Sequence, residues 1–197
     1  MRRVVFAAAC VVVLLSTSVS ATDNSPRVVT IEVLIDHGDD VVRAHQAISS
    51  AVLDVSGVFR REFNIEFKVV VVGSWRPASQ HFDGNEAFSF LENAGHNRSD
   101  IVVAFTSRSF FADVPEETDS RITVKRTSGG LAKLGGNHAI VRLYDRANVI
   151  LIHEIAHLFM AQHSDDPGSV MYGDAIAATA FDEDSKEAVF QNRDRKF

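Results

Sequence analysis

The stretch HEIAHLFMAQHSDDPGSVMY, residues 153–172, brings three histidines, one glutamate and one methionine–tyrosine pair into a short span. If its first part is helical, His153 and His157 lie one above the other, because residues four apart share a helix face. Two imidazole nitrogens on one face can bind a single metal ion. Glu154 is rotated by about 100° from His153, so it stays off the metal but can reach a water molecule bound there. The pattern predicts a zinc site for hydrolysis with Glu154 as general base.

A zinc ion in a hydrolase needs a third protein ligand and keeps one position open for water. His163 is the candidate, but it lies six residues beyond His157, where a continuing helix would place it on the wrong face. The chain must therefore leave the helix near Met160 and turn back sharply before it reaches His163.

These residues resemble the metzincin family of zinc endopeptidases, whose motif is HExxHxxGxxH followed by a turn that contains a methionine. The resemblance implies that His153, His157 and His163 bind Zn²⁺. It also implies that Met171, in the segment SVMY, supports the site from below. The segment HSDDPGSVMY is most similar to the matrixin branch of the family.

One position departs from the family pattern, because Met160 stands where the family has glycine. A residue with a Cβ in the left-handed conformation costs roughly 1–2 kcal/mol. A structural zinc site contributes on the order of 10 kcal/mol, so zinc binding can offset this cost. Should the helix instead continue through Met160, a carboxylate such as Asp174 or Glu187 would be the third ligand.

The sequence leaves alternatives open for each of these residues. His153 and His157 could be core histidines with other partners, although burying such groups without partners costs several kcal/mol. His163 could be a surface loop residue and Met171 an ordinary core methionine. At the level of function, the alternative is a catalytically silent, secreted binding domain in which Met160 has spoiled the metal geometry.

The segment GGLA, residues 129–132, is similar to the edge strand against which the metzincin family lays its substrate. The resemblance implies that Gly130, Leu131 and Ala132 offer backbone hydrogen bonds to an extended peptide. The expected partner is therefore a peptide or protein substrate, hydrolysed by an endopeptidase.

Residues 27–36 are rich in β-branched side chains and predict a buried strand. Apolar residues within 39–63 recur at spacings of three, four and seven, which is typical of an amphipathic helix, and 65–73 predicts a second strand. Such a unit normally pairs its strands in parallel through a right-handed crossover. Further strands are expected at 100–107, 121–127 and 139–143, and further helices at 84–95, after Asp145 as N-cap, and at 182–192.

The expected fold class is α+β, as in the metzincin-like zincin fold. It comprises a twisted, mostly parallel sheet with an antiparallel edge strand, two long helices, and a small C-terminal subdomain with a terminal helix. At 197 residues the chain predicts one catalytic domain, residues 22–197, with an N-terminal half to about 163 and a C-terminal half from 164. A monomer is the expected state.

The N-terminus predicts export. Two arginines, a short apolar run and small residues ending at Ala21 are typical of a signal peptide, residues 1–21, so the protein is expected to be secreted or periplasmic. The apolar run falls short of the roughly 20 residues of a membrane-spanning helix, so no stable membrane anchor is expected. Cys10, the only cysteine, lies in this leader, which excludes a thiolate ligand from the mature chain. With 20 basic against 26 acidic residues and no basic stripe, no nucleic acid partner is expected.

Overall fold

The computed structural model describes residues 25–76, 81–94, 98–115, 123–143, 146–173 and 178–197. The predicted signal peptide, residues 1–21, and the alternative ligand Asp174 lie outside the described residues. The described residues form helices α1 (Val41–Phe63), α2 (Gly84–Asn93), α3 (Ala147–Leu158) and α4 (Glu183–Gln191). Their strands are β1 (Arg27–Asp36), β2 (Ile65–Trp75), β3 (His81–Asp83), β4 (Ile101–Thr106), β5 (Ser109–Pro115), β6 (Thr123–Ser128), β7 (Gly130–Ala132) and β8 (His138–Arg142).

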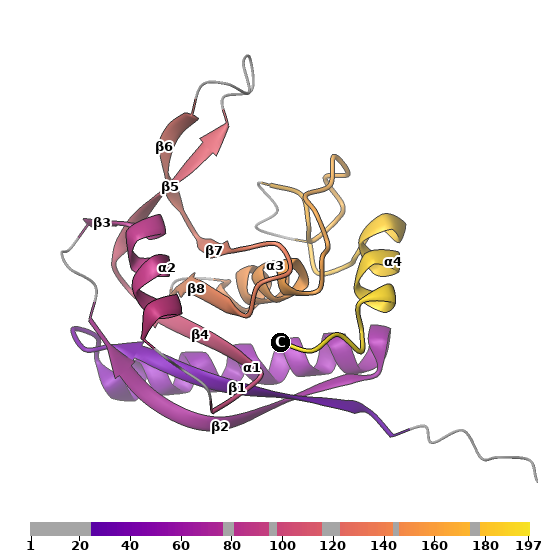
Figure 1. Cartoon of the computed structure of the whole chain (residues 1–197), viewed down its shortest axis with the longest axis horizontal. Coiled ribbons are helices and arrows are strands. Elements are labelled where there is room, and N and C mark those ends of the chain that lie inside the picture. Colours follow the sequence, from indigo (N-terminus) through magenta and orange to yellow (C-terminus); the bar gives the residue numbers. More distant parts are fainter. Residues whose placement is uncertain (1–24, 77–80, 95–97, 116–122, 144–145, 174–177) are drawn as a thin grey trace, which may run out of the picture.

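A five-stranded sheet in the order β2-β1-β4-β8-β7 forms the centre of the fold (Figure 1). The pairs β1–β2, β1–β4 and β4–β8 are parallel, and only β7 runs antiparallel, at the edge beside β8. The opening β-α-β unit and the mostly parallel sheet with an antiparallel edge strand are therefore as predicted. The result is a mixed α/β fold in which long helices pack on a parallel sheet.

Successive side chains of the central strands point to opposite faces of the sheet, and the hydrophobic core is divided between these two faces. In β4, Val103 packs in the larger core together with residues of α1 and α3, whereas the next residue, Ala104, packs in a second core with α2. Successive strand residues point to opposite faces, so a central strand covered on both sides is apolar throughout. All six residues of β4 are buried accordingly. The helix that carries the HEIAH segment thus lies against the sheet, inside the molecule.

Helix α1 begins and ends at residues that are suited to cap a helix. The side chain of Asp40 accepts hydrogen bonds from the backbone N–H groups of Val42 and Arg43, which is a typical N-cap. Asn64 ends the helix in the left-handed conformation, with φ 55°. Strand β2 starts directly afterwards, at Ile65, and pairs with β1.

A second, three-stranded sheet in the order β3-β5-β6 was not predicted as such. The strand expected at 121–127 overlaps β6, which pairs antiparallel with β5 at the edge of this small sheet. The antiparallel edge strand of the main sheet is β7, which lies within the segment GGLA, as the resemblance implies.

The predicted N-cap of helix α3 is wrong. Asp145 lies outside the described residues, and the residue in the N-cap position of α3 is Arg146. Arg146 has a φ of 76° and makes no side-chain cap hydrogen bond; its carbonyl accepts from Val149 at 3.0 Å. Burial of α3 in the core therefore stabilises this end of the helix without a side-chain cap.

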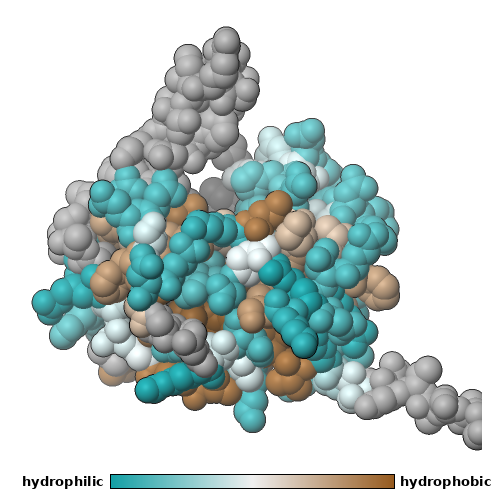
Figure 2. Space-filling view, in the orientation of Figure 1, coloured by the Kyte–Doolittle hydropathy of each residue, from teal (hydrophilic) through white to brown (hydrophobic). Residues whose placement is uncertain are grey.

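Hydrophilic residues cover most of the face shown in Figure 2, and the hydrophobic residues there form separate patches. Among the described residues, no helix combines the length and the apolar character that crossing a bilayer requires.

Candidate metal centre

Helix α3 is apolar on almost every side, which is the reason it lies buried in contact with strands β7 and β8 and with α1. Nine of its 12 residues are buried, and they include Glu154 and His157. A helix buried in this way has little freedom to shift or tilt. It therefore holds His153, Glu154 and His157 in fixed positions.

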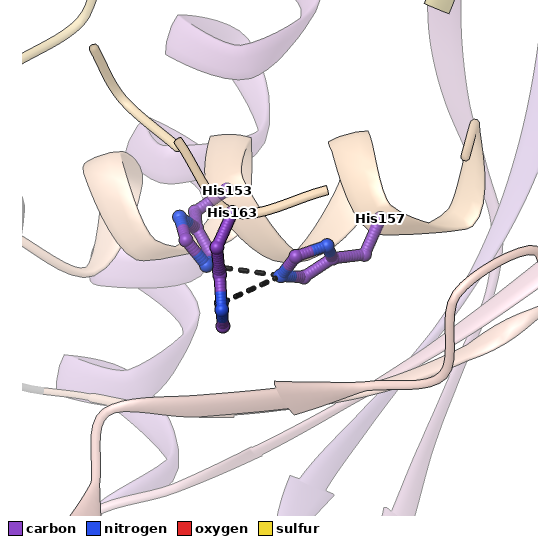
Figure 3. Close-up of side chains that lie close together, drawn as sticks. All are labelled: His153, His157 and His163. Atoms are coloured by element: carbon purple, nitrogen blue, oxygen red, sulfur yellow. Dashed lines mark hydrogen bonds between the residues drawn. The ribbon is translucent and has the colours of Figure 1, made fainter. Parts of the chain in front are cut away.

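Three histidine rings converge on one point (Figure 3). The Nε2 atom of His157 lies 3.0 Å from Nε2 of His153 and 3.2 Å from Nε2 of His163. These three residues are the group of potential metal ligands found among the described residues, with ligand atoms within 4.8 Å of one another. Zinc–nitrogen bonds of about 2.0–2.1 Å in tetrahedral geometry fit a triangle of this size.

The other ring nitrogens fix the tautomers. Nδ1 of His153 lies 2.7 Å from the carbonyl oxygen of Val170, and Nδ1 of His157 lies 2.7 Å from the carbonyl oxygen of Ala161. A carbonyl can only accept, so both Nδ1 atoms carry the proton and both Nε2 atoms present a lone pair. Two lone pairs facing each other at 3.0 Å repel unless a cation lies between them. The residues present therefore fit a divalent metal such as zinc.

The sharp turn predicted after His157 is present. Met160 has a φ of 73°, in the left-handed region. The N–H of Met160 donates to the His157 carbonyl at 3.0 Å, and the N–H of Ala161 donates to the Ala156 carbonyl at 3.1 Å. This pair of bonds is a Schellman motif, in which the left-handed position usually holds glycine. The turn reverses the chain and brings His163 back to the other two histidines.

Replacing Met160 by glycine is expected to raise the free energy of unfolding by about 1 kcal/mol, because glycine relieves the left-handed strain at some cost in unfolded-state entropy. Met160→Val should lower it by about 1–2 kcal/mol, because a β-branched residue tolerates this conformation least. Urea unfolding of the metal-free proteins measures both changes. A stabilising effect of Met160→Val, or a loss of stability in Met160→Gly, would contradict the strain ascribed to this position.

The segment around Met171 is tied to the histidines and to α4. Met171 is fully buried, its carbonyl accepts from the N–H of Ser164 at 2.9 Å, and the preceding carbonyl, of Val170, is the partner of His153. Ser169 donates to Asp182, the N-cap of α4, at 2.5 Å. Burial acts to raise the pKa of Asp182, but hydrogen bonds from Ser169 and Ser185 outweigh it and lower the pKa to about 2. These hydrogen bonds fix the segment from Ser164 to Met171.

Burial also sets the protonation of the site in the metal-free protein. It lowers the pKa of His153 to about 4 and that of His157, helped by the neighbouring His153, to about 3. The pKa of His163 is also lowered, because the groups around its ring partly desolvate it although the residue as a whole is exposed. All three imidazoles are therefore neutral at neutral pH, which is the form that binds metal. Burial raises the pKa of Glu154 to about 8. A nearby bound cation would favour the carboxylate and bring this pKa down again.

Glu154 is only 6% exposed and lies against β7, close to Gly130. The proposed alternative ligand Glu187 lies elsewhere: it is an exposed residue of α4, and its carboxylate accepts from the side chain of Gln191 at 2.6 Å. Among the described residues the structure therefore brings His163, and not Glu187, to the histidine pair.

A cavity of about 570 Å³ adjoins the metal centre on the side of His163. Its lining comes from the segment after α3 and from the start of α4, and includes Gln162, Asp165, Asp166, Asp182 and Glu183. The edge strand β7, with Gly130, Leu131 and Ala132 half-buried, contacts α3. The centre thus has an edge strand beside its helix and an open, polar space beside its third histidine.

Fold and site together define a metzincin-type zinc peptidase: an HExxH helix on a mostly parallel sheet, a third histidine after a left-handed turn, and a buried methionine segment. Residues 45–164 match the family described as "Metallo-peptidase family M12B Reprolysin-like". The chain belongs to this family. The matched range contains the three histidines and Glu154, but it gives no support to the matrixin branch in particular.

Solved structures show the same fold. The chain is similar to archaemetzincin from Methanopyrus kandleri, with 18% identity and a TM-score of 0.61, over 89% of this chain and 99% of that one. It is also similar to metalloproteinase-II from Bacteroides fragilis, with 15% identity and a TM-score of 0.62, over 86% of this chain and 54% of that one. No curated protein sequence matches the chain. At these identities the likeness concerns the fold.

Sequence reasoning missed the backbone groups of the site. The carbonyls of Val170 and Ala161 orient two imidazoles, and the N–H of Gly135 donates to the His157 carbonyl at 2.8 Å. Backbone groups occur at every residue, so no sequence signal distinguishes these three. The contact between Gly130 and Glu154 was missed for a related reason, since it depends on how a strand packs against a helix.

Proposed function

We propose that this protein is an exported, zinc-dependent endopeptidase in which Glu154 is the general base. The observation that carries the proposal is the convergence of three imidazole Nε2 atoms, two of which backbone carbonyls keep unprotonated, next to the buried carboxylate of Glu154. His153, His157 and His163 would hold the zinc ion, whose chemistry is to polarise the scissile carbonyl and acidify a water molecule. Export rests on the sequence of residues 1–21 alone.

Glu154 performs the proton transfers. Its carboxylate accepts a proton from the attacking water and passes it to the nitrogen of the leaving amine, so that the peptide C–N bond breaks and the carboxylate is regenerated. Because Glu154 is already held in a fixed position next to His153, little entropy is lost in positioning this base at each turnover. The carbonyls of Val170 and Ala161 keep two imidazoles in the ligand tautomer throughout.

Strand β7 is the proposed substrate platform. As an antiparallel edge strand beside the catalytic helix, it can add an extended peptide as a further strand, through the backbone of Gly130, Leu131 and Ala132. The segment that contains Met171 would support the histidines, because the carbonyl of the preceding residue, Val170, orients the ring of His153. We further propose a monomer with one catalytic domain over residues 22–197.

The purified mature protein is expected to cleave fluorescein-labelled, unfolded casein, because the substrate platform reads backbone and not a folded surface. Treatment with 1,10-phenanthroline should abolish cleavage, and one equivalent of Zn²⁺, added after the chelator has been removed, should restore it. Fluorescence release measures both steps. Zinc bound at one equivalent without any cleavage of casein or of a peptide library would instead support the silent binding domain.

The structure weakens the reason for that alternative. A silent domain would follow if Met160 prevented the turn, but Met160 adopts the left-handed conformation and His163 lies beside His157. The geometry therefore favours a complete site.

A further inference from the structure

We propose that Gly130 is a positioning residue: the space left by its missing side chain is the slot that holds Glu154. The role in catalysis rests on the proposed function, whereas the slot itself does not. The sequence predicts only that Gly130 lends backbone hydrogen bonds to substrate. The packing around Glu154 gives it a different task.

The closeness of the two residues is the first observation. A Cβ placed on Gly130 would lie 2.3 Å from Oε1 of Glu154 and 2.6 Å from both Cδ and Cγ. Real Cβ contacts are essentially never shorter than 3.0 Å. Rotating the carboxylate alone would not relieve the overlap, because Cγ is also too close. The whole Glu154 side chain would have to move.

The backbone of Gly130 gives no other reason for glycine at this position. Among the described residues, the glycine with a positive φ is Gly135, at 69°, whereas Gly130 has a conformation that alanine also adopts. Gly130 pairs with Val141 in regular antiparallel register. The absence of a side chain, and not the freedom of the backbone, is therefore what the structure requires here.

Neither partner can move away to make room. Strand β7 is paired with β8, and the N–H of Gly135, in the loop after β7, donates to the carbonyl of His157 on α3 at 2.8 Å. Helix α3 is buried on nearly every side, and His153 is bonded to the Val170 carbonyl. An added methyl group would consequently displace the Glu154 side chain, which is 6% exposed, and leave the histidines in place.

Thermal unfolding of the metal-free protein tests the slot without any activity. Gly130→Ala should lower the melting temperature by about 3–8 °C when Glu154 is present, because the methyl group overpacks the interface. In a Glu154→Ala background the same change should cost about 1 °C or nothing, because the methyl group then occupies vacated space. Equal losses in the two backgrounds would overturn the proposal. Gly57→Ala is the matched control, since a Cβ at Gly57 meets nothing within 4 Å.

Steady-state kinetics test the consequence for catalysis, with a fluorogenic peptide taken from a mapped casein cleavage site. Gly130→Ala should lower kcat by about 100-fold, because a displacement of about 1 Å has effects of that size. KM should change by less than about threefold, since alanine keeps the backbone N–H and carbonyl that could bind substrate. Zinc affinity should also change by less than about threefold, because the histidines stay in place. A raised KM with unchanged kcat would assign Gly130 to substrate binding alone and overturn its positioning role. If the unaltered protein has no peptidase activity, the proposed function fails while the thermal test still decides the slot.

Discussion

Replacing His163 by alanine is expected to lower zinc affinity by on the order of 1,000-fold, because about 10–16 kcal/mol of zinc binding is shared among few ligands. The loss follows from the geometry: Nε2 of His163 lies 3.2 Å from that of His157 and completes the triangle of nitrogens. Competition with a chromophoric chelator measures the dissociation constant. The fold should persist, because His163 is an exposed residue of the segment after α3.

His45→Ala is a suitable control for this experiment. His45 is exposed on α1, remote in sequence from the site, and its removal should leave zinc affinity unchanged. If the His163 variant kept the affinity of the parent, a carboxylate would have to be the third ligand. Asp174, which lies outside the described residues, would then be the first candidate.

Replacing Glu154 by glutamine is expected to lower kcat by about 10³-fold or more while zinc remains bound, since general base catalysis contributes about 10²–10⁴-fold. Glutamine has nearly the same shape, so it fits the buried space against β7, but its amide cannot accept the proton of the attacking water. Zinc analysis of the purified variant and hydrolysis of labelled casein are the two measurements. A variant that retained both zinc and activity would remove Glu154 from the mechanism.

The Glu154→Gln variant also separates binding from chemistry. An amide in place of the carboxylate should leave the three imidazoles and their partners Val170 and Ala161 undisturbed. Joint loss of zinc and activity would mean that Glu154 supports the metal site, and not that it transfers protons. The expected outcome is therefore a zinc-loaded, folded and inactive protein.

The sequence predicted the parts of the fold that depend on local pattern. Strand β1 has the expected limits, Arg27–Asp36, because β-branched residues make up most of it. Helix α1 begins two residues after the start of the predicted range, at Val41, because Asp40 is the residue that caps it. The small sheet of β3, β5 and β6 was not foreseen, because β3 is three residues long and its partner lies far away in the sequence.

For the metal site, spacing was sufficient to predict which histidines come together but not what surrounds them. The four-residue interval between His153 and His157 determines a shared helix face, and the need for a third ligand required a turn at Met160. That Met160 would adopt the left-handed conformation could be expected only from the resemblance to a glycine-containing motif, since methionine itself gives no such signal. The slot at Gly130 depends on the distance between a strand and a helix, which tertiary packing sets.

X-ray absorption spectroscopy at the zinc edge of the purified protein tests the central claim most directly. We expect one zinc ion per chain with three imidazole nitrogens at about 2.0–2.1 Å and one further light ligand from water. A protein purified with zinc bound by only two imidazoles, or one that takes up no zinc at neutral pH, would contradict the account.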